Sequence, residues 1–193
     1  MTRRLKPLLF TGPPGIGKST AVRKVTDALE LTGVHGLHSG EIRVEGKRQG
    51  FKLELVPSGE SGVLASPDIE GDVRFGTLRP DGKRRLGLSL EFLEKVACPS
   101  LRAALPTAHL MVIDEIGPMQ ARSAVFRHLV EEIVASDVPL LASIALADEP
   151  WISGLRDSSD IAVIPLTLGN RDTVVEAASH YLRALLAPES SRP

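Results

Sequence analysis

The amino-acid sequence predicts an α/β fold in which a mostly parallel central sheet is flanked by helices and carries a β-rich antiparallel extension. The strand-like run 5–10 is followed by a glycine-rich loop and then by a segment with helical spacing. The apolar run 109–113 has the composition of a central parallel strand and leads into two carboxylates. Residues from about 40 to 90 alternate apolar with polar side chains. We therefore expect one domain over 1–193, with the extension at about 40–90 and a flexible tail at 187–193.

Composition and charge exclude several classes of protein. Lys and Arg number 23 against 24 Asp and Glu in 193 residues, so the net charge of -1 lends no support to nucleic acid as a partner, although it leaves that partner open. The single cysteine, Cys98, excludes an internal disulfide and a thiolate zinc site. The N-terminal apolar run is broken by Pro7 and Gly12 and is too short for a signal peptide or a membrane span. We expect a cytoplasmic protein without membrane association, and a monomer, because no long apolar seam stands out.

The first half of the chain predicts a strand, a helix and then a series of short strands. After the glycine loop, apolar residues recur on one helical face as far as Leu29, and Gly33 ends the helix. A β-hairpin follows, with arms at 41–44 and 51–56. Turn-forming residues divide 63–90 into further short antiparallel strands, which make up most of the extension.

The second half of the chain returns to alternating helices and strands. The pattern predicts, in order, a helix over 91–105, a strand over 109–113, a helix over 125–134, strands over 138–146 and 161–166, and a final helix capped by Asn170. Pro99 is expected to interrupt the first of these helices, because proline lacks the N–H that the helix requires.

The segment 12–20, GPPGIGKST, matches the P-loop or Walker A pattern G-x-x-x-x-G-K-S/T and stands between a strand and a helix, as that pattern requires. Glycines let backbone N–H groups turn toward phosphate oxygens, and the following helix directs its positive dipole end at the same anion. Lys18 would contact the β- and γ-phosphates, and the Ser19 hydroxyl would ligate Mg²⁺. The alternative is an incidental Gly/Pro turn. We predict a nucleoside triphosphate site formed by Gly12, Pro13, Pro14, Gly15, Ile16, Gly17, Lys18, Ser19 and Thr20.

The segment 111–115 supplies a second part of the site, because a buried strand that ends in carboxylates is typical of a Walker B motif. Asp114 is predicted to hold Mg²⁺ through its water shell. Glu115 is predicted to accept a proton from an attacking water, which makes Glu115 and Lys18 the candidate catalytic residues. The alternative is that both carboxylates end the strand as a solvated turn. Together with the P-loop, they predict Mg²⁺-dependent hydrolysis.

Beyond these two motifs, the blocks GEIRVEGKRQGFKLELV, Leu64-Ala65, IDEIGPM and Asn170-Arg171 occur in an order that resembles the thermophilic or cancer-related nucleoside-triphosphatase family. The resemblance extends over nearly the whole chain. It implies a small P-loop NTPase that hydrolyses ATP, GTP and other triphosphates slowly and with loose base selectivity. It also adds three candidate nucleotide-binding residues by their positions in these blocks, namely Arg43, Asn170 and Arg171.

Two positions depart from the family pattern. Gln120 stands where the family often has Glu after Met, and Gly169 stands where Glu commonly precedes Asn-Arg. If either carboxylate contributes to catalysis in relatives, the rate or the mechanism of this chain differs from theirs.

Several roles stay open at the level of sequence. An arginine can stabilise the transferring phosphoryl group, and Trp151 either stacks on a base or packs against the body of the protein. The candidate arginines are Arg43, Arg48, Arg122 and Arg171.

Two other functions also stay open. A P-loop kinase would bind ATP in the same way, and a nucleotide-dependent switch would use slow hydrolysis to time a conformational state. The Walker B glutamate favours water as the acceptor, and the sequence lacks the guanine-reading N-K-x-D motif of GTP switches.

Overall fold

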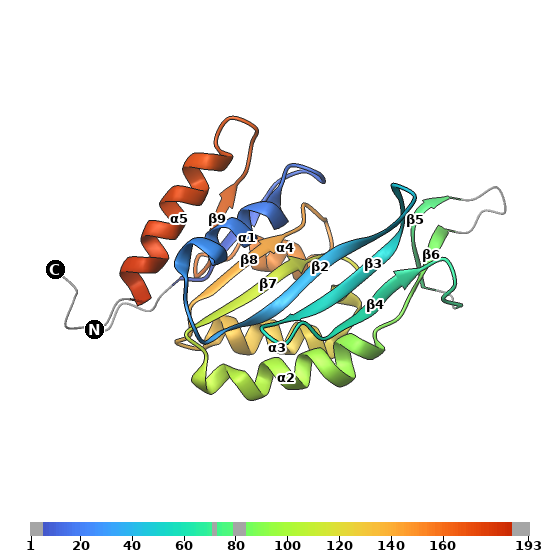
Figure 1. Ribbon diagram of the computed structural model, residues 1–193, viewed down its shortest axis with the longest axis horizontal. Helices are drawn as coiled ribbons and strands as arrows, with labels where there is room; N and C mark the ends of the chain where they lie inside the picture. The colour runs from blue at the N-terminus through green and yellow to red at the C-terminus, as the bar shows by residue number, and fades with distance from the viewer. Residues whose placement is uncertain (1–5, 71–72, 79–83, 187–193) are drawn as a thin grey trace.

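A nine-stranded mixed sheet runs through the molecule in the order β5-β6-β4-β3-β2-β7-β8-β1-β9 (Figure 1). The structure is a computed structural model that describes residues 6–70, 73–78 and 84–186. The tail expected at 187–193 lies outside these residues. Strands β2, β7, β8, β1 and β9 are parallel neighbours, whereas β2, β3, β4, β6 and β5 pair antiparallel. The predicted α/β class, with a mostly parallel core and antiparallel strands at one edge, is confirmed.

The elements follow the predicted order with shifted ends. The strands are β1 (Leu8–Thr11), β2 (Val34–Val44), β3 (Lys47–Val56), β4 (Ser61–Ser66), β5 (Arg74–Leu78), β6 (Arg84–Leu88), β7 (Leu110–Ile116), β8 (Leu140–Ile144) and β9 (Ala162–Pro165). The helices are α1 (Lys18–Leu29), α2 (Cys98–Ala104), α3 (Ala124–Ala135), α4 (Pro150–Arg156) and α5 (Arg171–Leu186). A π-helical turn occupies Leu93–Ala97, and 3-10 turns occupy Leu105–Thr107 and Gln120–Arg122. Among the described residues, no helix has the length and apolar character needed to cross a membrane.

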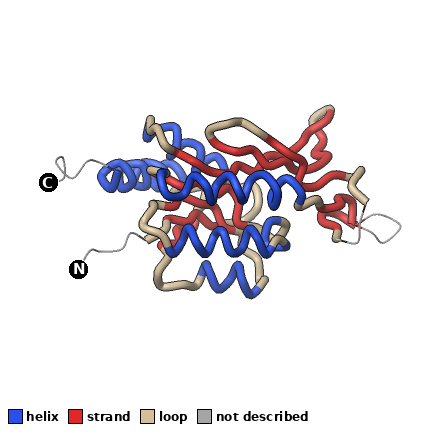
Figure 2. The backbone as a smooth tube through the Cα atoms, turned by 90° about the horizontal axis from the view of Figure 1, so that it is seen from below, coloured by secondary structure: helices blue, strands red, loops and turns tan. Residues whose placement is uncertain are grey.

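Helices cover both faces of the parallel part of the sheet. Helices α1 and α5 pack on one face over a core that includes Phe10, Val22 and Val112. Helices α2 and α3 pack on the other face over a core that includes Ile113 and Phe126. Figure 2, seen from below, shows helices along the parallel part and strands alone toward the far end of the extension. The strands of a parallel sheet are buried on both faces, which explains why β1, β7 and β8 read as nearly continuous apolar runs.

Strand β2 joins the two parts of the sheet. Its first residues, from Val34 to His38, pair in parallel with β7, and Gly36 to Val44 pair antiparallel with β3. The sequence predicted only the hairpin arm that begins at 41. The first residues of β2 have partner strands on both sides and are mostly buried, so they lack the alternation of apolar and polar side chains that identifies the exposed end of the strand.

Pro99 does not end its helix, contrary to the prediction of an interruption there. The chain is helical from the π-helical turn Leu93–Ala97 directly into α2, with Pro99 in the first turn of α2. The backbone N–H of Cys98 donates to the carbonyl of Leu93, five residues earlier. The π-helical turn is wider than an α-helical turn, so it leaves room for the proline ring. The helix therefore stays continuous although Pro99 has no N–H to donate.

Gly36 lies at a close approach between β2 and β7, and it generates a prediction about stability. A Cβ at this position would collide with the carbonyl oxygen of Val112, its register partner. We expect Gly36→Ala to lower the free energy of unfolding by about 1–3 kcal/mol, because the strands must separate to admit the methyl group. The matched control is Gly154→Ala in α4, where nothing lies within 4 Å of the added carbon. Chemical denaturation of both variants measures the difference, and equal stabilities would contradict the prediction.

Candidate functional site

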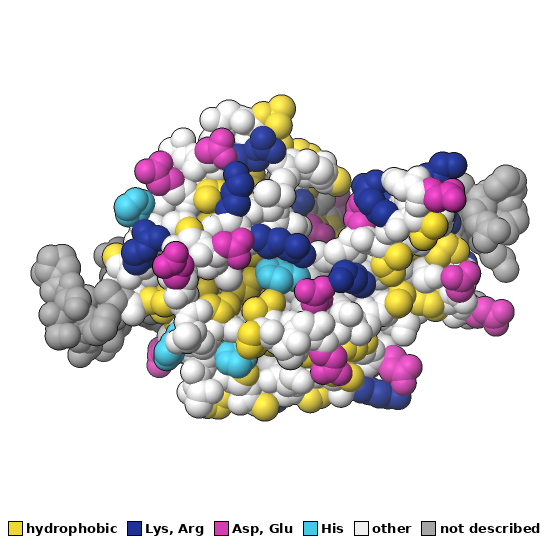
Figure 3. Space-filling model, viewed as in Figure 1, with side chains coloured by type: hydrophobic (Ala, Val, Ile, Leu, Met, Phe, Trp, Pro, Cys, Tyr) yellow, Lys and Arg dark blue, Asp and Glu magenta, His cyan; other side chains and the backbone are white. Residues whose placement is uncertain are grey.

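A cavity of about 710 Å³ opens where the P-loop, the end of β7 and the antiparallel strands meet. Figure 3 shows the surface hollowed between the part of the molecule that carries α1 and the projecting extension. The parallel alignment of β1, β7 and β8 brings the carboxyl ends of these strands to one edge, where ligands of open α/β sheets bind. The cavity is lined by Gly12, Pro14, Gly15, Gly17, Lys18, Ser19, Thr20, Arg23, Ser39, Gly40, Glu41, Arg48, Phe51, Leu64, Glu115, Pro118, Met119, Gln120, Ala145, Leu146 and Ala147.

The P-loop lines this cavity along much of its length. Gly15 and Gly17 have φ angles of 79° and 104°, a region that side-chain-bearing residues rarely adopt. Helix α1 begins immediately after Gly17, with no side-chain cap and no acidic residue in its first turn. The first N–H groups of α1 therefore have no carboxylate of their own helix to satisfy them, which suits an anion. Ser19 and Thr20 are exposed on this first turn and line the cavity, whereas Pro13 and Ile16 do not line it.

Lys18 is buried between the P-loop and the end of β7. Its side-chain Nζ donates to the carbonyl of Gly12 at 3.0 Å and lies 3.5 Å from Oε1 of Glu115. Only 9% of Lys18 is exposed, so its ammonium depends on these oxygens in place of water. The two candidate catalytic residues are thus brought together from segments almost a hundred positions apart.

Asp114 is fully buried at the end of β7. Its Oδ1 accepts a hydrogen bond of 2.6 Å from the Ser143 hydroxyl on the neighbouring strand β8, and its Oδ2 has no hydrogen-bond partner. A buried carboxylate oxygen without a donor is costly unless a cation neutralises it. Carboxylate and hydroxyl oxygens are the kinds of ligand that Mg²⁺ prefers, and Asp114 and the exposed Ser19 supply one of each, although Asp114 itself is not part of the cavity lining.

Glu115 faces the cavity, with 31% of its side chain exposed. Burial raises the pKa of this carboxyl above its ordinary value, and the nearby Lys18 ammonium opposes that rise. A carboxylate with a raised pKa is a stronger base than an exposed one, which suits a group that takes up a proton.

The extension contributes polar groups to the cavity, and of these the sequence had named only Arg48, as one of four candidate arginines. Ser39 and Glu41 on β2, and Arg48 on β3, line the cavity. Arg48 donates to Oε1 of Glu41 at 3.1 Å, and its guanidinium lies 5.2 Å from the ring centroid of Phe51. Arg43, which the sequence nominated for nucleotide binding, pairs with the same Glu41 and donates to the Gly46 carbonyl at the hairpin turn. Arg43 lies outside the cavity lining, whereas Arg48 is part of it.

The late pair Asn170-Arg171 supports loops and does not line the cavity. The Arg171 guanidinium donates a hydrogen bond of 3.2 Å to the carbonyl of Ile16, so Arg171 holds the backbone of the P-loop in place. Asn170 precedes α5, as predicted, but its side chain bonds the backbone of Pro165 and Thr167 and not the first turn of α5. Both residues thus bond the backbone of loops, Arg171 that of the P-loop and Asn170 that of the segment between β9 and α5.

Ser143 and Trp151 illustrate what the sequence could and could not reveal. Ser143 is the single polar residue in the buried strand β8, a signal that could have identified it as a partner for another buried polar group. Trp151 lies at the start of α4, where its ring contacts the edge of Phe126 and its indole N–H donates to Glu131. Trp151 therefore packs against α3 and is outside the cavity lining.

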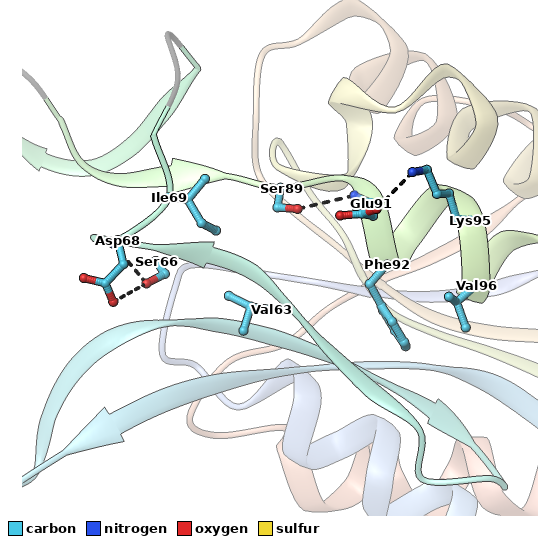
Figure 4. Close-up of a pocket in the computed structure, with 9 residues that line it drawn as sticks. All are labelled: Val63, Ser66, Asp68, Ile69, Ser89, Glu91, Phe92, Lys95 and Val96. Atoms are coloured by element: carbon cyan, nitrogen blue, oxygen red, sulfur yellow. Dashed lines mark hydrogen bonds and ion pairs between the residues drawn. The ribbon is translucent and has the colours of Figure 1, made fainter.

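A second hollow, of about 650 Å³, lies away from the P-loop (Figure 4). Val63, Phe92 and Val96 supply its apolar surface. Its polar groups bond one another: Glu91 pairs with Lys95, and the Ser66 hydroxyl donates to Asp68. This hollow shares no residue with the P-loop cavity.

Comparisons with known proteins identify a family for this chain. A family model described as NTPase matches residues 7–178. The nucleoside-triphosphatase THEP1 of Thermotoga petrophila is 33% identical over 176 residues, which cover 91% of this chain and 92% of that protein.

Solved structures resemble this chain over similar lengths. The crystal structure of THEP1 from the hyperthermophile Aquifex aeolicus has a TM-score of 0.78 at 29% identity, covering 92% of this chain and 99% of that one. The solution structure of a human cancer-related nucleoside triphosphatase has a TM-score of 0.72 at 28% identity, covering 98% and 100% respectively. The family resemblance inferred from the sequence is confirmed, and the chain belongs to the NTPase family.

Proposed function

We propose that this protein catalyses the Mg²⁺-dependent hydrolysis of nucleoside triphosphates to nucleoside diphosphate and phosphate. The observation that carries the proposal is the position of the Lys18 ammonium, between the Gly12 carbonyl of the P-loop and the Glu115 carboxylate of β7. This arrangement sets a phosphate-binding cation beside a group that can accept a proton from water.

The P-loop residues have a binding role in this proposal. The N–H groups at the start of α1 and the Lys18 ammonium hold the β- and γ-phosphates by charge-assisted hydrogen bonds. Asp114 and Ser19 would hold Mg²⁺, which when bound offsets the negative charge of the phosphates. Ser143 keeps the Asp114 carboxylate oriented through the hydrogen bond to Oδ1.

Glu115 has the chemical role. Its carboxylate accepts a proton from a water molecule as the water oxygen attacks the γ-phosphorus, and the bond from that phosphorus to the bridging oxygen breaks. The leaving diphosphate takes the electron pair, and Lys18 with the P-loop N–H groups stabilises the charge that develops on it.

Base selectivity and rate follow from the same site. The cavity-lining residues are mainly P-loop residues, charged groups and apolar side chains, and the chain has no N-K-x-D motif, which supports use of ATP, GTP and other triphosphates. Arg48 is the arginine of the extension that lines the cavity, and it is paired with Glu41. An arginine held by a carboxylate gives less help to the transferring phosphoryl group, which supports slow turnover.

Glu115→Gln tests the proposed base. The amide keeps nearly the same size but cannot accept the proton, so we expect nucleotide affinity to persist and kcat to fall by about 10²- to 10⁴-fold. Phosphate release and equilibrium nucleotide binding are measured on the same preparation. Glu91→Gln, in the second hollow, is the matched control and should keep full activity. Normal turnover by the Glu115 variant would exclude Glu115 as the base.

Lys18→Ala tests the phosphate-binding loop. Loss of the ammonium should weaken ATP binding on the order of 10- to 100-fold and abolish measurable turnover, because the charge-assisted contacts to the phosphates are removed. Lys24→Ala is the control, since Lys24 lies on the same helix but is exposed and pairs with Asp172. Unchanged affinity for ATP in the Lys18 variant, measured by calorimetry, would contradict the P-loop assignment.

A small-molecule kinase is the second candidate, and one observation favours it. The cavity lining includes the apolar side chains of Phe51, Leu64 and Met119, which a water nucleophile does not require. Phosphate release from ATP, GTP, CTP and UTP with Mg²⁺, and with no acceptor added, distinguishes the two functions. Release from several nucleotides supports hydrolysis. Tight binding without release would favour a kinase that lacks its acceptor, or a nucleotide switch that lacks its activator.

A further inference from the structure

Ser39 occupies a central place in the cavity wall that neither motif accounts for. It lies on β2, and its hydroxyl oxygen accepts two hydrogen bonds, one from the backbone N–H of Glu115 at 3.1 Å and one from the side-chain amide of Gln120 at 3.0 Å. Gln120 is only 2% exposed, so its amide is held in place by the surrounding protein. Ser39 therefore connects β2 to the end of β7 and to the turn that follows it.

The two accepted bonds decide what else the hydroxyl can do. A serine hydroxyl has two lone pairs and one proton. Both lone pairs are occupied, so the oxygen has none left to ligate a cation or to accept a proton from water. Within the described residues, no group accepts the Ser39 proton. The hydroxyl is therefore restricted to donating, and it borders the cavity beside Glu115.

We propose that Ser39 donates its hydroxyl proton to an oxygen of the γ-phosphate of the bound nucleoside triphosphate. The proposal deepens the proposed function, on which it rests. Phosphate oxygens are acceptors only, so they match a hydroxyl that can only donate. The γ-phosphate is the group expected at this end of the cavity, because Lys18 and Glu115 meet there. Ser39 is thus a catalytic residue that contacts the phosphoryl group while its oxygen restrains the backbone of the base.

Gln120 determines the direction of this hydrogen bond. An amide at this position can donate to Ser39, whereas a carboxylate can only accept. In Gln120→Glu, the carboxylate would take the Ser39 proton and turn the hydroxyl away from the nucleotide. Gln120→Glu is therefore expected to reproduce the loss of Ser39 without removing its side chain.

The test compares ligands that do and do not carry a γ-phosphate. For Ser39→Ala we expect affinity for adenylyl imidodiphosphate, a non-hydrolysable triphosphate analogue, to fall on the order of tenfold, while affinity for ADP stays within about twofold. The value of kcat for ATP should fall on the order of 10- to 100-fold. Gln120→Glu should show the same loss of preference for the triphosphate analogue, and the double variant should lose little more than either single variant. Ser89→Ala, in the second hollow, is the matched control.

Two results would overturn the proposal. Equal weakening of ADP and the triphosphate analogue would mean that Ser39 acts only by supporting the fold, and unchanged affinity for both, with unchanged kcat, would mean that it contacts no phosphate. Failure of the proposed function is distinct from either result, because it would appear as absence of phosphate release by the unmodified protein. In that case the affinity difference between the analogue and ADP still decides the role of Ser39.

Discussion

The burial of charge at the carboxyl edge of the parallel strands is the constraint on which the rest of the structure depends. Lys18 and Asp114 are both removed from water, and a buried ion is tolerated only when the surrounding protein supplies compensating polar groups. Lys18 obtains them from the Gly12 carbonyl and Glu115, and Asp114 obtains one from Ser143. These partners come from β1, β7 and β8 or the loops after them, so the charges are satisfied only when the strands lie side by side in this order. The same arrangement leaves one buried oxygen of Asp114 without a hydrogen-bond partner.

The antiparallel strands form part of the same wall. The sequence indicated a β-rich segment, and its contribution became visible only in three dimensions, where β2 and β3 place Ser39, Glu41 and Arg48 opposite the P-loop. The cavity is consequently built from two kinds of surface. One side is the P-loop backbone and the first turn of α1 with Lys18, which suit phosphate. The other side is formed by β2 and β3, which carry hydroxyl, charged and aromatic groups.

Sequence reasoning can propose site residues where a motif is contiguous in the chain, and it cannot do so where the position of a side chain depends on strand register. The P-loop and the carboxylates of β7 are contiguous motifs with their own physical requirements, and they could be identified without knowledge of the fold. Arg43 and Arg48 could not be distinguished in this way. They are register partners across the hairpin, next to an irregularity between Ile42 and Arg43 that changes the alternation of faces. Ser39 was missed for a different reason, since its partners Glu115 and Gln120 are more than seventy positions away along the chain. Pro99 shows a third limit, because the π-helical turn just before it lets the chain stay helical through a residue that normally ends a helix.

Strand β2 has a consequence for the modularity of this protein. Accessory segments are exchanged most easily when the chain enters and leaves them through surface loops. Here the chain enters the antiparallel region in the middle of a strand whose first residues are held by β7 and whose later residues are held by β3. Any graft or truncation made within β2 would cut a ladder of backbone hydrogen bonds next to Ser39. The parallel core and the extension are therefore one structural unit joined by β2, and we expect insertions and deletions to be tolerated best at the outer strands and their turns.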